Sequence, residues 1–121
     1  MTHERLGFHI LRLGLATIFL WFGFSQLVDG LSWVGFVPSW AVALFSLPPA
    51  MLVLINGALE VILGSLLALG LFVRPAALIL GFHLFIITIE IGATAIGVRD
   101  FGLTAATFAL ALLVPQKKKS I

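Results

Sequence analysis

Hydrophobic residues follow one another in four long stretches, separated by short segments that carry proline, glycine and charge. The first three stretches cover about residues 8–28, 51–71 and 75–93, and the fourth covers about residues 101–114. A helix needs about 20 apolar residues to cross a hydrocarbon core about 30 Å thick. The first three stretches have this length, so the pattern predicts that each is a membrane-spanning helix.

Prolines mark several of the expected helix ends. Pro48 and Pro49 precede the second stretch, and Pro75 suits the first turn of the third helix because its φ is already helical. Pro115 stops the fourth stretch, which is short at about 14 residues. We therefore expect this helix either to thin the bilayer around it or to begin earlier, in the segment 97–100.

The composition supports a membrane location. Hydrophobic residues make up 61% of the 121 residues and charged residues only 10%, and the mean hydropathy is +1.21. A small soluble domain leaves too much of its surface exposed to hide so many apolar side chains. The expected fold is all-α, an integral membrane four-helix bundle that forms a single domain over residues 1–121. The first stretch is longer than the apolar core of a signal peptide, so we interpret it as a retained helix.

Positive charges predict the orientation of the bundle. Arg5, Arg12, Arg74 and the lysines at 117–119 fall on one side, whereas the other side has Arg99 next to Asp100. Because basic residues favour the cytoplasmic face, both termini are expected in the cytoplasm, in a multi-pass protein of the inner (plasma) membrane. The lipid bilayer is then the main partner. The net charge of +2 comes from the terminal lysines, which argues against nucleic acid.

The outer connection between the first two spans, residues 29–49, is rich in aromatic residues and is interrupted by Pro38. Aromatic rings favour the headgroup region, so this connection is expected to lie in the membrane interface. Ser39 is a candidate cap for a short helix within it. The connection is either a plain anchoring loop or a lid, and Trp33 and Trp40 are the lid candidates.

Ionisable residues inside spans are costly, and they usually face the bundle interior and mark function. Glu60 lies near the middle of the second span and His83 near the middle of the third. These two helices are antiparallel neighbours, so we expect a central Glu60–His83 pair. Arg12 lies about 9 Å to the cytoplasmic side of its helix midpoint, within reach of Glu60 through a long guanidinium side chain.

Further polar residues lie in the outer half of the bundle. Arg99 is expected either to neutralise Glu90 or to stay paired with its neighbour Asp100. The sequence therefore predicts a second, outer cluster. Its members are Gln26, Asn56, Glu90, Arg99 and Asp100.

Two interpretations of these polar groups stay open. In the first, they neutralise each other and fix the register of the helices. In the second, a buried carboxyl group next to a histidine holds and passes protons. No metal site is expected, because His83 and Glu90 lie about 10 Å apart along their helix. Haem ligation is disfavoured because His9 and His83 differ in depth, and the lack of Cys excludes thiol chemistry by this chain.

Several motifs, in their order and spacing, resemble the DoxX family over nearly the whole chain. They are Arg12-Leu13-Gly14-Leu15 with Phe19-Leu20-Trp21-Phe22-Gly23, then Glu60-Val61-Ile62-Leu63-Gly64 with Gly70-Leu71-Phe72-Val73-Arg74-Pro75-Ala76-Ala77, and finally Arg99-Asp100-Phe101-Gly102-Leu103. The resemblance implies a four-helix membrane protein associated with redox systems, which include small quinone-linked subunits of sulfur-oxidising enzymes. A quinone is then the candidate cofactor.

Three functions are compatible with these observations. The first is an accessory or quinone-handling subunit of a membrane redox system, with Glu60 and His83 near the quinone ring or on a proton path. Its partners would be a redox protein or further copies of the chain. The second is a helix-docking assembly or binding protein without catalytic activity. The third, a small transporter, has less support because four helices leave little room for a pore.

Overall fold

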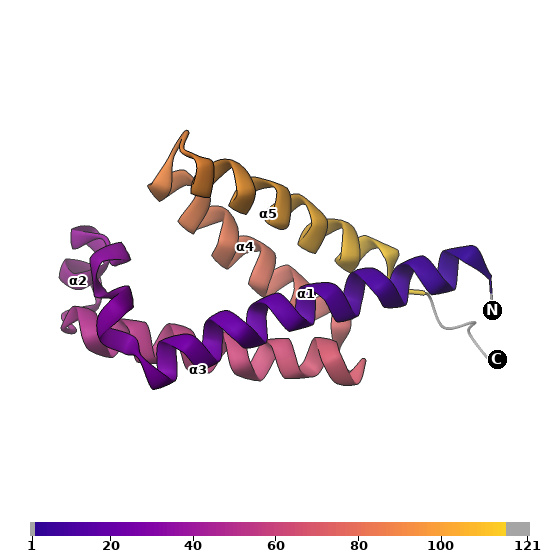
Figure 1. Cartoon of the computed structure of the whole chain (residues 1–121), viewed down its shortest axis with the longest axis horizontal. Helices are drawn as coiled ribbons and strands as arrows, with labels where there is room; N and C mark the ends of the chain where they lie inside the picture. The colour runs from indigo at the N-terminus through magenta and orange to yellow at the C-terminus, as the bar shows by residue number, and fades with distance from the viewer. Residues whose placement is uncertain (1, 116–121) are drawn as a thin grey trace.

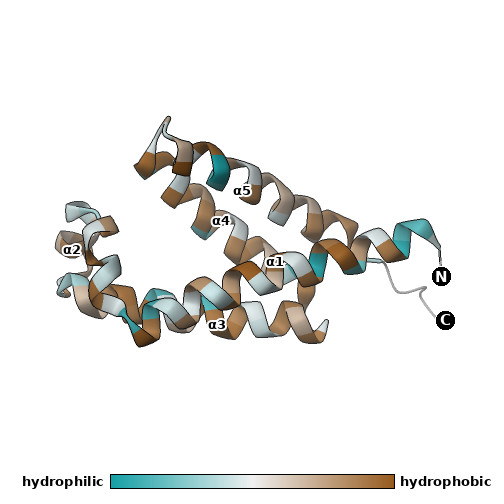
Figure 2. Cartoon of the chain, viewed as in Figure 1, coloured by the Kyte–Doolittle hydropathy of each residue, from teal (hydrophilic) through white to brown (hydrophobic). Residues whose placement is uncertain are grey.

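A computed structural model describes residues 2–115, and these residues form six helices joined by short connections (Figure 1). The helices are α1 (His3–Val28), the 3₁₀ helix η1 (Gly30–Phe36), α2 (Ser39–Phe45), α3 (Pro49–Leu69), α4 (Val73–Ile91) and α5 (Ala95–Leu113). Four of them, α1, α3, α4 and α5, are long and apolar enough to cross a membrane. Hydrophobic residues dominate these four helices in Figure 2, with hydrophilic patches at the start of α1 and near the start of α5. The chain is a multi-pass, all-helical membrane protein.

Local capping explains why two helices begin earlier than the hydrophobic pattern alone predicts. The side chain of Thr2 accepts a hydrogen bond from the Arg5 backbone N–H, so α1 begins at His3. The side chain of Thr94 accepts one from the Gly97 N–H in the same way, so α5 begins at Ala95. The fourth spanning helix therefore has 19 residues and includes the segment 97–100. Of the two alternatives for this short stretch, the earlier start is the one observed.

The turn between α3 and α4 is tight. Gly70 ends α3 in the left-handed conformation, with φ of 74°, and its N–H donates to the carbonyl oxygens of Leu66 and Leu67. Phe72 also adopts a positive φ, 49°, directly before α4 begins at Val73. The helix consequently starts before Pro75, which still lies in its first turn, where proline is tolerated.

The four long helices are arranged as two hairpins. Helix α1 packs mainly along α3, and α4 packs mainly along α5. Figure 1 shows that the two pairs approach each other near the start of α1 and the end of α5, and diverge toward α2. We call the end with the start of α1, the end of α5 and the α3–α4 turn the terminal end, and the end with η1, α2 and the α4–α5 turn the distal end.

Apolar side chains from both hairpins meet in the terminal half of the bundle. The core cluster there draws on all four long helices and consists of Phe8, Leu15, Ala16, Phe19, Leu63, Leu67, Val73, Ala76, Ala77, Leu80, Leu84, Leu110 and Ala111. Leu67, Leu80 and Leu110 are completely buried. Close packing of this kind holds the two hairpins together at the terminal end.

Two arginines fasten the helix ends at the terminal end. Arg12 of α1 donates from Nη1 to the carbonyl oxygens of Leu67 and Ala68, in the last turn of α3. Arg74 of α4 donates to the carbonyl oxygens of Ala111 and Val114, at the end of α5. Carbonyl groups in the last turn of a helix lack the usual partner four residues further on, and the negative end of the helix dipole attracts a cation. Each hairpin is thus closed by an arginine from one helix on the C-terminus of the other.

The connection between α1 and α3 forms η1 and the short helix α2. A short helix at this place is confirmed, but Ser39 is its first residue and not its cap. Pro38 occupies the cap position, and no side chain caps the helix by a hydrogen bond. Helix α2 ends at Phe45, since Ser46 turns the chain with a φ of 54°.

Candidate functional site

Polar side chains from α1 and α3 form a hydrogen-bonded chain inside the bundle. Asn56 donates from Nδ2 to Gln26 Oε1 at 2.7 Å and to Glu60 Oε1 at 3.3 Å. Gln26 and Glu60 are buried, and Glu60 is only 5% exposed. The four-residue step from Asn56 to Glu60 places both on one face of α3, as the sequence indicates. Gln26 and Asn56 are therefore linked to Glu60 and do not form a separate outer cluster.

His83 of α4 approaches this chain from the second hairpin. Its Nε2 lies 3.9 Å from Glu60 Oε1, which is beyond hydrogen-bonding distance, and its side chain is 26% exposed. The predicted closeness of Glu60 and His83 is thus observed. Within residues 2–115, neither Glu60 Oε2 nor His83 Nε2 has a hydrogen-bond partner, although both atoms are buried. Buried polar atoms nearly always have partners, so this pair is suited to receiving a polar group from outside the chain.

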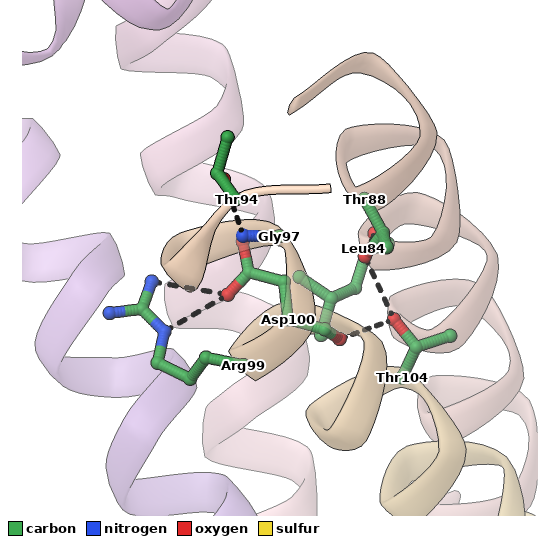
Figure 3. A network of polar contacts seen from close by, with 7 residues as sticks. All are labelled: Leu84, Thr88, Thr94, Gly97, Arg99, Asp100 and Thr104. Atoms are coloured by element: carbon green, nitrogen blue, oxygen red, sulfur yellow. Dashed lines mark hydrogen bonds and ion pairs between the residues drawn. The ribbon is translucent and has the colours of Figure 1, made fainter. Parts of the chain in front are cut away.

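Asp100 of α5 lies on the far side of the same interior. It is 6% exposed, and its Oδ1 accepts from Nε and Nη2 of Arg99 at 3.2 and 3.1 Å (Figure 3). Of the two alternatives for Arg99, pairing with Asp100 is the one observed. The Arg99 guanidinium carbon also lies 5.7 Å from the centre of the Phe22 ring on α1.

Two threonines continue the polar surface between α4 and α5. Thr104 donates from Oγ1 to the Asp100 carbonyl oxygen at 2.8 Å, and its Oγ1 lies 3.3 Å from Oγ1 of Thr88 (Figure 3). Thr88 in turn donates to the Leu84 carbonyl oxygen at 2.8 Å. Such bonds to the preceding turn are a common way to satisfy a hydroxyl group within a helix. Thr88 is a residue that the sequence interpretation overlooked, because it does not share the helix face of His83 and Glu90.

Glu90 lies apart from the interior network. It is exposed, and its Oε2 accepts a hydrogen bond of 2.9 Å from Nε1 of Trp40 on α2. The other lid candidate, Trp33, donates from Nε1 to Ser25 Oγ at 3.0 Å and packs edge-on against Phe22. Trp33 thus fastens η1 to α1, whereas Trp40 reaches across to the second hairpin.

Arg12 does not reach Glu60, contrary to the expectation from helix geometry. Its guanidinium bonds to the Leu67 and Ala68 carbonyls and contacts His9 Nδ1 at 3.2 Å. The carbonyls in the last turn of α3 lie at the same depth as Arg12, and they satisfy the cation without drawing it toward the bundle centre. Arg12 is therefore a residue of the terminal end and not of the interior site.

The interior site thus combines an acid, an imidazole and an amide pair around two buried atoms without partners. Glu60 and His83 supply an acceptor and a donor or acceptor for a small polar group, while Asn56 and Gln26 hold Glu60 in place. Within residues 2–115 no three His, Asp or Glu side chains are grouped so as to hold a metal ion. The arrangement is suited to hydrogen bonding and proton exchange with an uncharged ligand.

The chain was compared with protein families, with curated proteins and with solved structures. The family model DoxX matches residues 7–93, which run from the start of α1 to the α4–α5 turn. This range contains Gln26, Asn56, Glu60 and His83, whereas Arg99 and Asp100 lie beyond it. No curated protein and no solved structure matches the chain.

Proposed function

Because the chain belongs to the DoxX family, we propose that it is an accessory subunit of a membrane redox system and that Glu60 and His83 bind the polar groups of a quinone head group. The observation that supports this proposal most directly is the pair of buried atoms without partners, Glu60 Oε2 and His83 Nε2. They belong to different hairpins and lie beside the apolar core cluster, against which a flat lipid-soluble ring is accommodated well.

The donor and acceptor types fit such a ring. A quinone presents carbonyl oxygens that accept hydrogen bonds, and its reduced form presents hydroxyl groups that donate them. His83 Nε2, when it carries the ring proton, donates to a carbonyl oxygen, and Glu60 Oε2 accepts from a hydroxyl group. When bound, a quinone supplies two-electron redox chemistry coupled to protons. Glu60 and His83 then hold or release a proton at these two atoms.

The surrounding residues support these roles. Asn56 bonds Glu60 Oε1, which leaves Oε2 as the oxygen available to a ligand. The apolar cluster at the terminal end excludes water beneath the site, which strengthens polar contacts inside it. In this proposal the protein lies in the plasma membrane with both termini in the cytoplasm, and a redox enzyme is its partner.

The proposal is tested by measuring quinone bound to the protein purified in detergent, after lipid extraction. We expect Glu60→Gln and His83→Ala to lose most of the quinone that the unaltered protein retains. Glu4→Gln is the matched control, since it makes the same chemical change at an exposed carboxyl group in the first turn of α1, away from the site. Quinone absent from the unaltered protein, or retained equally by all variants, contradicts the proposal.

One observation favours a second function, a helix-docking assembly protein. The outer connection exposes large apolar side chains, among them Phe36, Trp40 and Phe45. An apolar patch of this kind marks either a lipid contact or a protein interface. A photoreactive group placed at Trp33 or Trp40 should then crosslink to a partner protein in membranes, and crosslinks to lipid alone argue against this function.

A further inference from the structure

Polar and apolar side chains divide the bundle interior into two halves. Glu60 and His83 lie near the middle, and the buried polar residues Gln26, Asp100 and Thr104 lie at the same depth or toward the distal end. On the terminal side of Glu60, the interior is filled by the apolar core cluster defined above. Thr107, which is completely buried there, directs its hydroxyl group to the Leu103 carbonyl of its own helix. A polar ligand or a proton would therefore meet an apolar barrier on the terminal side.

The two hairpins are each packed tightly but are joined less firmly at the distal end. Gly23 and Gly57 allow α1 and α3 to touch backbone to backbone, and Gly81 lies directly against the Phe108 ring. Two polar contacts link the distal ends of the hairpins. Trp40 donates to Glu90, and Arg99 lies over the Phe22 ring. Trp40, Glu90 and Arg99 are exposed, and Phe22 is partly buried. Polar contacts between exposed side chains are weak.

We infer that the Glu60–His83 site communicates with the membrane face at the distal end and is closed toward the terminal end, with the Trp40–Glu90 and Arg99–Phe22 contacts acting as latches between the hairpins. Breaking the latches lets the hairpins separate distally while the apolar cluster holds them at the other end. This hinge motion moves two packed pairs as units and leaves their internal packing intact. The inference rests on the interior site being functional but not on the identity of its ligand.

The absence of Cys from the sequence allows a direct test with single cysteines. Thr104→Cys reports whether the probe reaches the polar half of the interior. Thr107→Cys, one helical turn away on α5, reports whether it reaches the apolar half. The probe is a charged, membrane-impermeant methanethiosulfonate added outside sealed vesicles that contain the full chain. Glu4→Cys and Ser39→Cys, both at exposed positions, report the fraction of molecules with the terminal or the distal end outward.

We expect Thr104→Cys to be labelled in the same fraction of molecules as Ser39→Cys, and Thr107→Cys to stay unlabelled from either side. Adding Trp40→Phe removes the hydrogen-bond donor of one latch and should speed the labelling of Thr104→Cys about fivefold, the effect of losing one typical hydrogen bond. Thr88→Cys, on α4, repeats the measurement if Thr104→Cys does not fold.

Three results overturn the inference. The first is that Thr104→Cys is labelled in the same fraction of molecules as Glu4→Cys, which would place the access route at the terminal end. The second is that Thr104→Cys is not labelled from either side. The third is that Trp40→Phe leaves the labelling rate of Thr104→Cys unchanged. None of these measurements involves quinone, so failure of the access route is distinguishable from failure of the proposed function. A latched protein that binds no quinone would still show the expected labelling.

Discussion

Gly23 of α1 and Gly57 of α3 bring their backbones so close that a Cβ atom placed on either glycine would lie 2.9 Å from the carbonyl oxygen of the other. Membrane helices gain much of their association from such close packing, because lipid provides no hydrophobic force between them. Asn56, next to Gly57, bonds Gln26 at the same crossing. The glycine contact therefore also sets the distance at which the polar chain of the site can form.

Gly23→Ala should weaken the α1–α3 pairing. The added methyl group would meet Val61 as well as the Gly57 carbonyl, and overpacking of this kind destabilises by about 1–3 kcal/mol. The measurement is the free energy of unfolding in mixed micelles, titrated with a denaturing detergent. Gly14→Ala is the control, since nothing lies within 4 Å of a Cβ there, and it should be neutral or stabilise the helix by up to about 1 kcal/mol. Equal effects of the two substitutions would show that the crossing is not close-packed.

Arg12→Ala should destabilise the protein by about 1.5–3 kcal/mol, the range for hydrogen bonds from a charged group. It removes the bonds to the Leu67 and Ala68 carbonyls and takes the cation away from the negative end of the α3 dipole. Arg5→Ala, an exposed position in the first turns of α1, should change the free energy of unfolding by less than about 0.5 kcal/mol. A loss at Arg12 no larger than that at Arg5 contradicts the capping role.

The losses caused by Arg12→Ala and Arg74→Ala should add. Arg12 acts on the end of α3 and Arg74 on the end of α5, so the two residues share no partner carbonyl. Independent sites add to within about 0.5 kcal/mol. The double variant, unfolded in the same detergent titration, checks this expectation. A loss well below the sum would mean that both arginines stabilise one shared structure and not two separate hairpins.

Gln26 and Asn56 should be coupled energetically. A double-mutant cycle with Gln26→Leu and Asn56→Leu isolates the hydrogen bond between them, and bonds of this kind in membrane proteins are worth about 0.6 kcal/mol, with a maximum of about 1.7. Asn56→Leu leaves the buried Gln26 amide without its partner, whereas Gln26→Leu leaves Asn56 bonded to Glu60 alone. The losses of the two single variants should therefore add up to more than the loss of the double variant. A cycle that pairs Gln26→Leu with Thr107→Ser, far from this bond, should give no coupling. Coupling of the same size in both cycles would show that the effect is not specific to the bond.

The sequence predicts the spans well because polar groups are costly in lipid, so each span is a long stretch of hydrophobic residues. It predicts helix ends less well, because Thr2 and Thr94 start α1 and α5 through local hydrogen bonds outside the hydrophobic stretches. Both threonines precede the helix by one residue, so a closer examination of capping residues would have found them.

The central site is partly predictable for the same reason. Depth along antiparallel helices was enough to bring Glu60 and His83 together. Depth alone did not predict the partner of Arg12, because backbone carbonyls at the end of α3 bind its guanidinium in place of Glu60. Every residue has a backbone carbonyl, so no sequence pattern indicates which one will act as the acceptor. The pairing of α1 with α3, which joins Gln26 to Asn56, depends on which small-residue faces meet, and several faces of that kind are present.

The division into hairpins also bears on how the protein is made. Every partner that α1 and α3 need for their mutual packing, including the Arg12 bonds, is present once the ribosome has synthesised the chain through Gly70. The first hairpin can therefore assemble in the membrane before α4 and α5 are inserted. The α3–α4 turn is accordingly the place where the gene could be divided into two fragments that reassemble when they are expressed together.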